Sequence, residues 1–324
     1  MQQSAPRAAG QPTPRISVIV PSYQRPAHLA HCLRALEWQL PAPEVVVSVR
    51  SQDSESQVVL ARPWRLDLRV ARVDRPGLMV AMNAALDLVS GEVTALLDDD
   101  TEPWPDWTAR IARAFSDPQL VGLGGRDVQR SADGAEMFFR SPSTPVGQVT
   151  WFGRHIGNHH LGAGGPRGAQ VLKGANSAYR TWALRSLGFD RRMRGNTVLH
   201  WELSLGLTLR CSGAKLLYDP QLLVEHRLGR RPGGEARDRP ERDYRAQVNF
   251  NEALALTEHF AALGPLRSAV FWLYAECVGT RESPGLAQVL RFALRGQPDI
   301  YARWAAAAQA RWQARALLRA GQRA

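Results

Sequence analysis

The stretch "VTALLDDDTEP" (Val93–Pro103) joins an apolar segment to three consecutive carboxylates. Val93–Leu97 has the composition of a buried strand, and Asp98, Asp99 and Asp100 follow at once. Like charges this close repel one another, so a fold that keeps them at a strand end needs a group that neutralises them. Mg²⁺ and Mn²⁺ prefer oxygen ligands, and residues two apart in an extended segment point the same way. The stretch therefore indicates a divalent-metal site, a nucleotide-sugar site built on such a metal, or a solvated loop.

Strand and helix patterns alternate on both sides of this stretch. Short apolar runs predict strands at Ile16–Val20, Glu44–Val49, Leu68–Val73, Val93–Leu97 and Leu120–Gly125, and two further short strands in "AKLLYDP" (214–220) and "LLVEH" (222–226). Helical spacing predicts helices at His28–Gln39, Leu78–Val89, Trp104–Asp117 and His200–Gly213. This alternation predicts an α/β fold with a Rossmann-like, mostly parallel sheet flanked by helices. Ligands bind such sheets beyond the carboxyl ends of the strands, so the residues after each strand should meet the aspartates in one cleft.

Composition limits the classes of protein that fit. The 324 residues suffice for one large domain or a domain with an appendage. The net charge of +11 suggests an anionic partner, which could be a phosphorylated ligand, a nucleic acid or an acidic membrane, or else an Arg-rich composition. Three cysteines without a CxxC pair argue against a zinc site and fit a reducing cytoplasm. The sequence contains no run of about 18 apolar residues, so no membrane-spanning helix is expected. The first 15 residues lack the apolar core of a secretory signal.

One competing reading of the acidic stretch is a phosphatase of the haloacid-dehalogenase type. Such enzymes have the pattern DxDxT directly after their first strand. Here the residue four positions after Asp98 is Glu102, and the aspartates follow the fourth predicted strand. Both differences argue against this class.

Five segments occur in an order that is shared by one enzyme family. They are "ISVIVPSYQR" (16–25), "RPGLMVAMNAALDLVSGEVTALLDDD" (75–100), "VGLGGRDV" (121–128), "VLKGANSAYR" (171–180) and "WELSLGLTLRCSGAKLLYDPQLLVEH" (201–226). In these segments the chain resembles the family 2 glycosyltransferases, which are inverting enzymes with the GT-A fold. The resemblance implies transfer of a sugar from a nucleoside diphosphate sugar to a hydroxyl acceptor. That acceptor could be a glycan, a lipid-linked sugar or a metabolite, as in bacterial-type polysaccharide or glycoconjugate synthesis.

The resemblance also implies a division of the chain. Residues 1–15 are expected to be a disordered leader, and residues 16–242 the GT-A domain. Its nucleotide-binding half spans about 16–125 and its acceptor half about 126–242, in which residues 141–168 should form loops or a small antiparallel flap. Residues 243–324 are expected to be a helical extension, whose last helix carries five arginines and no acid. This basic helix predicts peripheral contact with the inner face of an anionic membrane, or packing on the domain with a solvated basic face.

The donor side of the site is implied by the same resemblance. Asp98 would contact the ribose or the metal, Asp99 would help to position the sugar or the metal, and Asp100 would bind Mn²⁺ or Mg²⁺. His226 at the end of "LLVEH" would be a third metal ligand, or else an ordinary hydrogen-bonded histidine. The nucleotide-sugar site would further include Pro21, Tyr23, Arg25, Arg50, Asp53, Asn83 and Arg230. Arg230 lies in an Arg-rich segment that would close over the diphosphate.

The acceptor side is expected around a carboxylate. The family has an Asp as catalytic base in the first turn of the helix before "SGAKLL", and Glu202 stands at that position, one methylene longer. Without the resemblance, Glu202 would read as an acid favoured by the helix dipole. Gly174, Ala175, Asn176 and Trp201 would contact the acceptor. The family's uracil-reading "Asp-Asp-Gly-Ser" is replaced by "SVRSQDS" (48–54), which leaves the base open among uridine, thymidine and guanosine.

Three other functions remain possible at this stage. A nucleotidyltransferase would carry a Gly-rich loop with Arg and Lys after the first strand, which "PSYQRPAH" (21–28) lacks. A non-catalytic GT-A-like module would bind a nucleotide sugar without transfer or hydrolysis. A basic nucleic-acid-binding protein would show salt-sensitive affinity, but the sequence has no recognised nucleic-acid motif, so no nucleic-acid partner is expected.

Overall fold

The computed structural model describes residues 13–130, 141–196, 198–227, 242–297 and 299–321. Within them, nine strands form one sheet in the order β3-β2-β1-β4-β10-β6-β11-β5, with β9 beside β11. The strands are β1 Ile16–Ser22, β2 Glu44–Arg50, β3 Asp67–Val73, β4 Val93–Leu96, β5 Thr101–Pro103, β6 Leu120–Arg130, β9 Arg167–Gly168, β10 Ser177–Arg180 and β11 Lys215–Arg227. A separate hairpin pairs β7 (Gln148–Val149) with β8 (His155–Ile156), which confirms the antiparallel flap.

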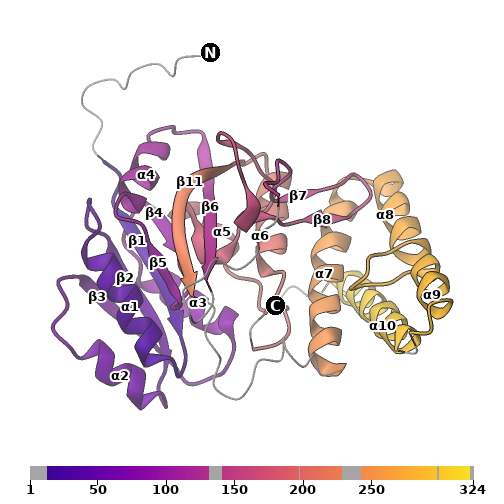
Figure 1. The fold of residues 1–324 in the computed structure, drawn as a ribbon, viewed down its shortest axis with the longest axis horizontal. Coiled ribbons are helices and arrows are strands. Elements are labelled where there is room, and N and C mark those ends of the chain that lie inside the picture. Colours follow the sequence, from indigo (N-terminus) through magenta and orange to yellow (C-terminus); the bar gives the residue numbers. More distant parts are fainter. Residues whose placement is uncertain (1–12, 131–140, 197, 228–241, 298, 322–324) are drawn as a thin grey trace.

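Helices cover both faces of the sheet (Figure 1). They are α1 Pro26–Glu37, α2 Ser54–Leu60, α3 Leu78–Leu88, α4 Trp107–Ala114, α5 Thr181–Leu187, α6 Trp201–Cys211, α7 Arg242–Ala262, α8 Pro265–Cys277, α9 Leu286–Ala293 and α10 Ile300–Arg319. Val18 and Val20 of β1 share one buried core with α1 and α4, whereas Ile19 points into a second core with α3 and α6. Burial on both faces explains why the strands read as continuous apolar runs.

The parallel strands place their carboxyl ends at one edge. β1 pairs in parallel with β2 and with β4, so that Ser22 lies beside Val49 and Ile19 beside Leu96. The segments after β1, β2 and β4 therefore leave the sheet on the same side. This confirms the predicted mostly parallel α/β sheet. Three strands of the described sheet break the parallel pattern: β10 runs antiparallel between β4 and β6, and β5 and β9 run antiparallel to β11.

The structure corrects the expected end of the domain in one respect. "AKLLYDP" and "LLVEH" were expected as two short strands, but they form the single strand β11, with a register shift between Asp219 and Leu223. Pro220 lies in this irregularity, where a missing N–H can be tolerated. The far end of β11 pairs antiparallel with β5, which sets His226 opposite Thr101. This pairing brings His226 next to the aspartates.

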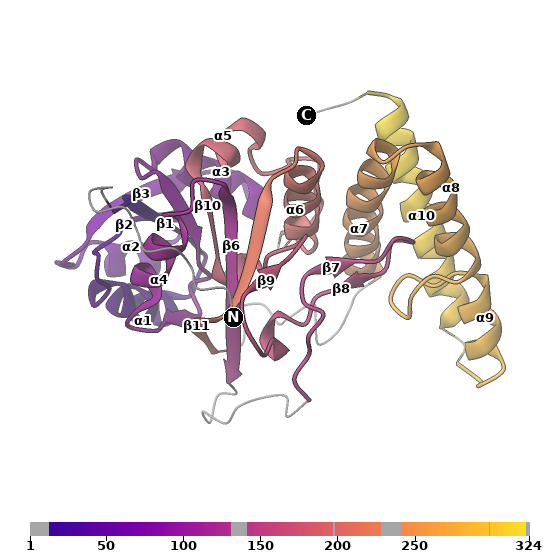
Figure 2. The same ribbon diagram turned by 90° about the horizontal axis from the view of Figure 1, so that it is seen from above.

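The C-terminal helices extend from the sheet through α6. α7 packs between α6 and α10, and Figures 1 and 2 show α8–α10 at the end of the molecule opposite β3. Phe250 and Leu254 of α7 belong to the same core as α6. In α10, Ala307, Ala310 and Ala314 are buried. The described part of the chain contains no helix whose length and apolar character would let it cross a membrane.

Candidate active site

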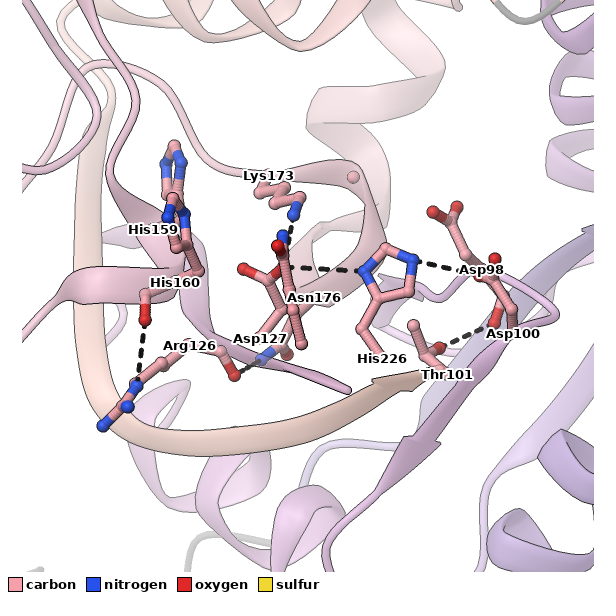
Figure 3. A network of polar contacts seen from close by, with 12 residues as sticks. Asp98, Asp100, Thr101, Arg126, Asp127, His159, His160, Lys173, Asn176 and His226 are labelled. Carbon is pink, nitrogen blue, oxygen red and sulfur yellow. Dashed lines mark hydrogen bonds and ion pairs between the residues drawn. The ribbon is translucent and has the colours of Figure 1, made fainter. Parts of the chain in front are cut away.

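Asp98, Asp100 and His226 converge where β4 and β11 end (Figure 3). One ligand atom from each lies within 4.8 Å of the others. The segment after β4 delivers the two aspartates, and the antiparallel pair of β11 with β5 delivers the histidine. His226 Nε2 lies 3.3 Å from Asp100 Oδ1. The structure thus brings these three predicted residues together, although His226 lies 126 positions after Asp100.

The guanidinium of Arg25 neutralises charge on two of the three aspartates. Its Nη1 lies 3.0 Å from Asp99 Oδ1, and its Nη2 contacts Asp100. Ser22 Oγ donates a 2.7 Å hydrogen bond to Asp99 Oδ2. All these side chains are buried or nearly so. Arg25 was expected to line the base pocket, but its guanidinium instead binds the carboxylates that follow β4.

His226 has a second carboxylate on its other side. Its Nδ1 lies 3.5 Å from Asp127 Oδ2, and Lys173 Nζ contacts the same oxygen. Asp127 is completely buried on β6, and Lys173 precedes the 3₁₀ turn Gly174–Asn176. Figure 3 shows the four groups in a row from Lys173 to Asp100. The sequence analysis missed Asp127 and Lys173, because residues 46 apart carry no local signal of their pairing.

The charges in this row shift one another's pKa values. Burial opposes the imidazolium form of His226, but Asp100 and Asp127 outweigh it and raise the pKa of His226 to about 9. Burial alone would raise the pKa of Asp100, yet His226 and Arg25 hold it below its usual range. Asp99 differs, since burial and the charge of Asp100 raise its pKa to about 7. Adjacent carboxylates therefore have opposite tendencies to ionise.

Glu202 lies in the first turn of α6, beside the turn at Gly174. The Gly174 N–H points at Glu202 Oε1 over 3.4 Å, a long and weak contact. Burial raises the pKa of Glu202 to about 7, and the nearby charge of Asp98 adds to the shift. Trp201 is buried and packs on Gly174, where a Cβ would overlap its indole ring. A half-buried carboxylate with a pKa near neutrality can accept a proton.

The residues expected around the nucleotide lie at the ends of β1 and β2. Pro21 is half-buried and Tyr23 is half exposed, directly after the buried part of β1. Arg50 ends β2. The Asp53 carboxylate accepts a 2.5 Å hydrogen bond from Gln24 N and a 3.1 Å hydrogen bond from Ser56 N, so it ties the segment after β1 to the start of α2. The structure thus brings these positions to one edge, with Asp53 engaged by backbone groups.

Two amides that were expected to contact substrates are engaged inside the fold. The Asn83 amide bonds to the backbone of Phe189 through both its nitrogen and its oxygen, at 2.8 and 2.9 Å, and also to Met79 O. Asn176 is fully buried and bonds to Trp107 Nε1, Leu222 O and Arg126 O. Ala175 is buried as well. The geometry therefore gives Asn83 and Asn176 a structural role, because their polar atoms hold distant segments together.

A solvent-open hollow lies beside the aspartates on the α1 side. It is lined by Ala27, His28, His31, Asp99, Asp100, Thr101, Glu102 and Arg227. The Arg227 N–H donates to Asp100 O at 2.9 Å, and its Nε lies 3.0 Å from Glu102 Oε1. Arg227 thereby fixes the end of β11. Arg230 of the expected closing segment lies outside the described residues.

Comparison with solved structures identifies the class of fold. The mannosyltransferase PcManGT from Pyrobaculum calidifontis, solved with GDP-Man and Mn²⁺, matches with a TM-score of 0.51 at 17% identity, covering 92% of this chain and 87% of its own. S. aureus TarS 1–349 matches with a TM-score of 0.50 at 18% identity, covering 95% of this chain and 92% of its own. The UDP-GlcNAc complex of TarS 1–349 gives 0.52, again at 18% identity and with 95% and 92% covered. At such identities the likeness shows the fold, which is GT-A.

The family profile described as "Glycosyl transferase family 2" matches residues 17–184, more than half of the chain. The protein therefore belongs to glycosyltransferase family 2 and is a glycosyltransferase, as the five sequence segments implied. A comparison with curated proteins found no match.

The donor set of the acidic cluster fits a divalent cation. Two carboxylates and an imidazole are ligand types that Mn²⁺ accepts. Asp100 Oδ1 is buried and accepts no hydrogen bond of good geometry from the described residues, although His226 Nε2 lies 3.3 Å away. A buried carboxylate oxygen left in this state is poorly satisfied unless a cation completes its shell. The cluster could therefore hold a metal ion.

Proposed function

We propose that the protein is a metal-dependent, inverting glycosyltransferase that moves a sugar from a nucleoside diphosphate sugar to a hydroxyl acceptor. The observation that carries this proposal is the convergence of Asp98, Asp100 and His226 within 4.8 Å, with a carboxylate of raised pKa, Glu202, near enough to feel the charge of Asp98. The cluster would bind the metal ion that holds the diphosphate, and Glu202 would accept a proton.

Asp98, Asp100 and His226 would hold Mn²⁺ or Mg²⁺. The ion, when bound, would neutralise charge on the diphosphate as it leaves. Asp98 is the most exposed of the three aspartates and would also reach the ribose. Asp99 is buried under Arg25 and would hold that arginine in place rather than touch the sugar.

Glu202 would act as the general base. Its carboxylate would accept the proton of the acceptor hydroxyl while that oxygen forms a bond to the anomeric carbon. The bond from this carbon to the diphosphate breaks on the opposite face, so the configuration inverts. The Gly174 N–H and the packing of Trp201 would keep the carboxylate in position.

The donor base would be read at the ends of β1 and β2, by Pro21, Tyr23, Arg50 and the backbone held by Asp53. Structural relatives were solved with GDP-Man and with UDP-GlcNAc, so both bases must be tested. Arg230 would contact the diphosphate of the donor. A thermal-shift screen of UDP, GDP and dTDP sugars with Mn²⁺, Mg²⁺ or a chelator tests the proposal, because a bound donor raises the apparent stability. Failure of every donor to shift the melting temperature would contradict the proposal.

We further propose that residues 16–242 form the transferase domain, at the cytoplasmic side, and that 243–324 form an extension in peripheral contact with an anionic membrane. Leu290 of α9 and Leu294, which directly follows the helix, are 68% and 89% exposed, next to Arg291 and Arg295. α10 offers fewer arginines to a membrane than its sequence suggested, because Arg311 is buried and bonds to Glu276. Apolar residues beside arginines favour binding to anionic lipid.

Vesicle sedimentation tests the membrane contact. We expect binding to vesicles with phosphatidylglycerol and little binding to pure phosphatidylcholine. The double variant Leu290→Asp/Leu294→Asp should lose the binding, whereas Val58→Asp, at an exposed position of α2, should keep it. Equal binding of both variants would contradict the contact through α9.

A further inference from the structure

The histidine of the proposed metal cluster is held from behind by a buried ion pair. Asp127 Oδ2 lies 3.5 Å from His226 Nδ1, an ionic approach without hydrogen-bond geometry, and Lys173 Nζ contacts the same oxygen. Asp127 has no exposed surface, whereas the Lys173 side chain is 27% exposed. Gln129 Nε2 also donates to Asp127 Oδ2, at 3.0 Å. Asp127 is thus a buried carboxylate whose cationic neighbours are one lysine and one histidine.

The two ring nitrogens of His226 face different partners. Nε2 faces Asp100 at 3.3 Å and Nδ1 faces Asp127, as Figure 3 shows. An imidazole can bind a metal only through a nitrogen that carries no proton. A carboxylate at Nδ1 favours a proton on that nitrogen and fixes the ring plane, so Nε2 is the nitrogen that would give up its proton to a bound cation.

We propose that Asp127, itself held by Lys173, is a positioning residue that orients the His226 ring so that Nε2 points into the cation site. The inference rests on the proposed metal-dependent function, and it extends it to two residues for which the family resemblance gave no role. The three residues come from three separate segments: Asp127 from β6, His226 from β11 and Lys173 from the segment before β10.

Lys173 gives this arrangement a second consequence. It directly precedes Gly174, whose N–H points at Glu202 Oε1. One segment therefore contacts the carboxylate behind the metal ligand and also the proposed base. A shift of Lys173 would therefore disturb both the carboxylate behind His226 and the proposed base Glu202.

Manganese binding without donor tests the proposal, by calorimetric titration or by the loss of the free Mn²⁺ resonance signal. Removal of the carboxylate behind a metal-bound histidine typically weakens metal binding about 10–100-fold, and we expect this loss for Asp127→Asn. Because Asp127 acts through His226, the Asp127→Asn change should cost little further affinity in a His226→Gln background. Lys173→Met should give a smaller loss than Asp127→Asn.

Two variants guard against a general effect on folding. Glu44→Gln neutralises another buried carboxylate, bonded to Ser17, Ser90 and Arg69 at the opposite end of the sheet, and should leave Mn²⁺ affinity unchanged. Asp127→Asn/Lys173→Met removes both charges of the pair and carries the test if Asp127→Asn fails to fold. Wild-type affinity in either Asp127 variant, or additive losses with His226→Gln, would overturn the positioning role alone. No Mn²⁺ binding by the wild type would overturn the metal-dependent function as well.

Discussion

Arg25 Nη1 lies 3.0 Å from Asp99 Oδ1 and its Nη2 contacts Asp100, so one guanidinium spans two of the three aspartates. Its side chain is only 9% exposed, and that of Asp99 only 4%. Removing one partner of a buried ion pair leaves an uncompensated charge, which typically costs about 3–5 kcal/mol. Arg25 therefore belongs to the stability of the site as well as to its charge.

Arg25→Met should accordingly lower the free energy of unfolding by about 3–5 kcal/mol in urea titrations. Mn²⁺ should stabilise this variant more than the wild type, because a cation can replace the lost guanidinium. Arg34→Met, at an exposed position of the same helix, serves as the control and should change little. Equal stability of the two variants would show that Arg25 does not neutralise the aspartates.

Asp100→Ala should abolish metal binding and reduce donor turnover by about 100-fold or more, since stabilisation of a leaving diphosphate by a metal is worth several kcal/mol. Asp100 Oδ1 lies 3.3 Å from His226 Nε2 in the proposed ligand set. The measurements are Mn²⁺ titration and hydrolysis or transfer of the donor. Full activity of Asp100→Ala, or of the wild type with a chelator, would argue against metal dependence.

The parallel strands and the aspartates of the cluster could be predicted because both leave a local trace in the sequence. A strand buried on both faces is a continuous apolar run, and Asp98 and Asp100 follow such a run directly. Asn83 and Asn176 left no comparable trace of their roles. Asn83 bonds to Phe189, 106 residues away, and Asn176 to Arg126, 50 residues away. A sequence gives the type of each side chain, whereas its partner is set by the packing of distant segments.

Arg25 and Asp127 illustrate the same limit inside the site. The motif at the end of β1 placed Arg25 near the cleft, but which anion it binds depends on the segment that follows β4. Asp127 falls where β6 runs beyond the predicted strand Leu120–Gly125, in a position that reads as polar and exposed. It is buried, and Lys173 and His226 from distant segments lie against its carboxylate.

The contact between Gly174 and Trp201 predicts a positional effect on the base. A Cβ at Gly174 would overlap the indole ring of Trp201, the residue directly before Glu202. Gly174→Ala should therefore lower kcat while leaving donor affinity unchanged, and should cost about 1–3 kcal/mol of stability through overpacking. Gly168→Ala, where a Cβ meets no described atom within 4 Å, should behave like the wild type in both assays. An unchanged kcat in a folded Gly174→Ala protein would contradict the coupling.

The raised pKa of Glu202 leads to a prediction about the pH dependence of sugar transfer. Burial raises its pKa from 4.5 to about 7, and a general base must be ionised to accept a proton. The value of kcat/KM should therefore rise about tenfold per pH unit below pH 7 and level off above it, in assays at a fixed, saturating metal concentration. Glu202→Gln should keep donor affinity, lose about 10²–10⁴-fold in transfer, and lose the rising limb. Glu202→Asp restores the shorter acid expected at this position and should recover part of the activity together with the limb. A rising limb that persists in Glu202→Gln would assign the titrating base to another residue.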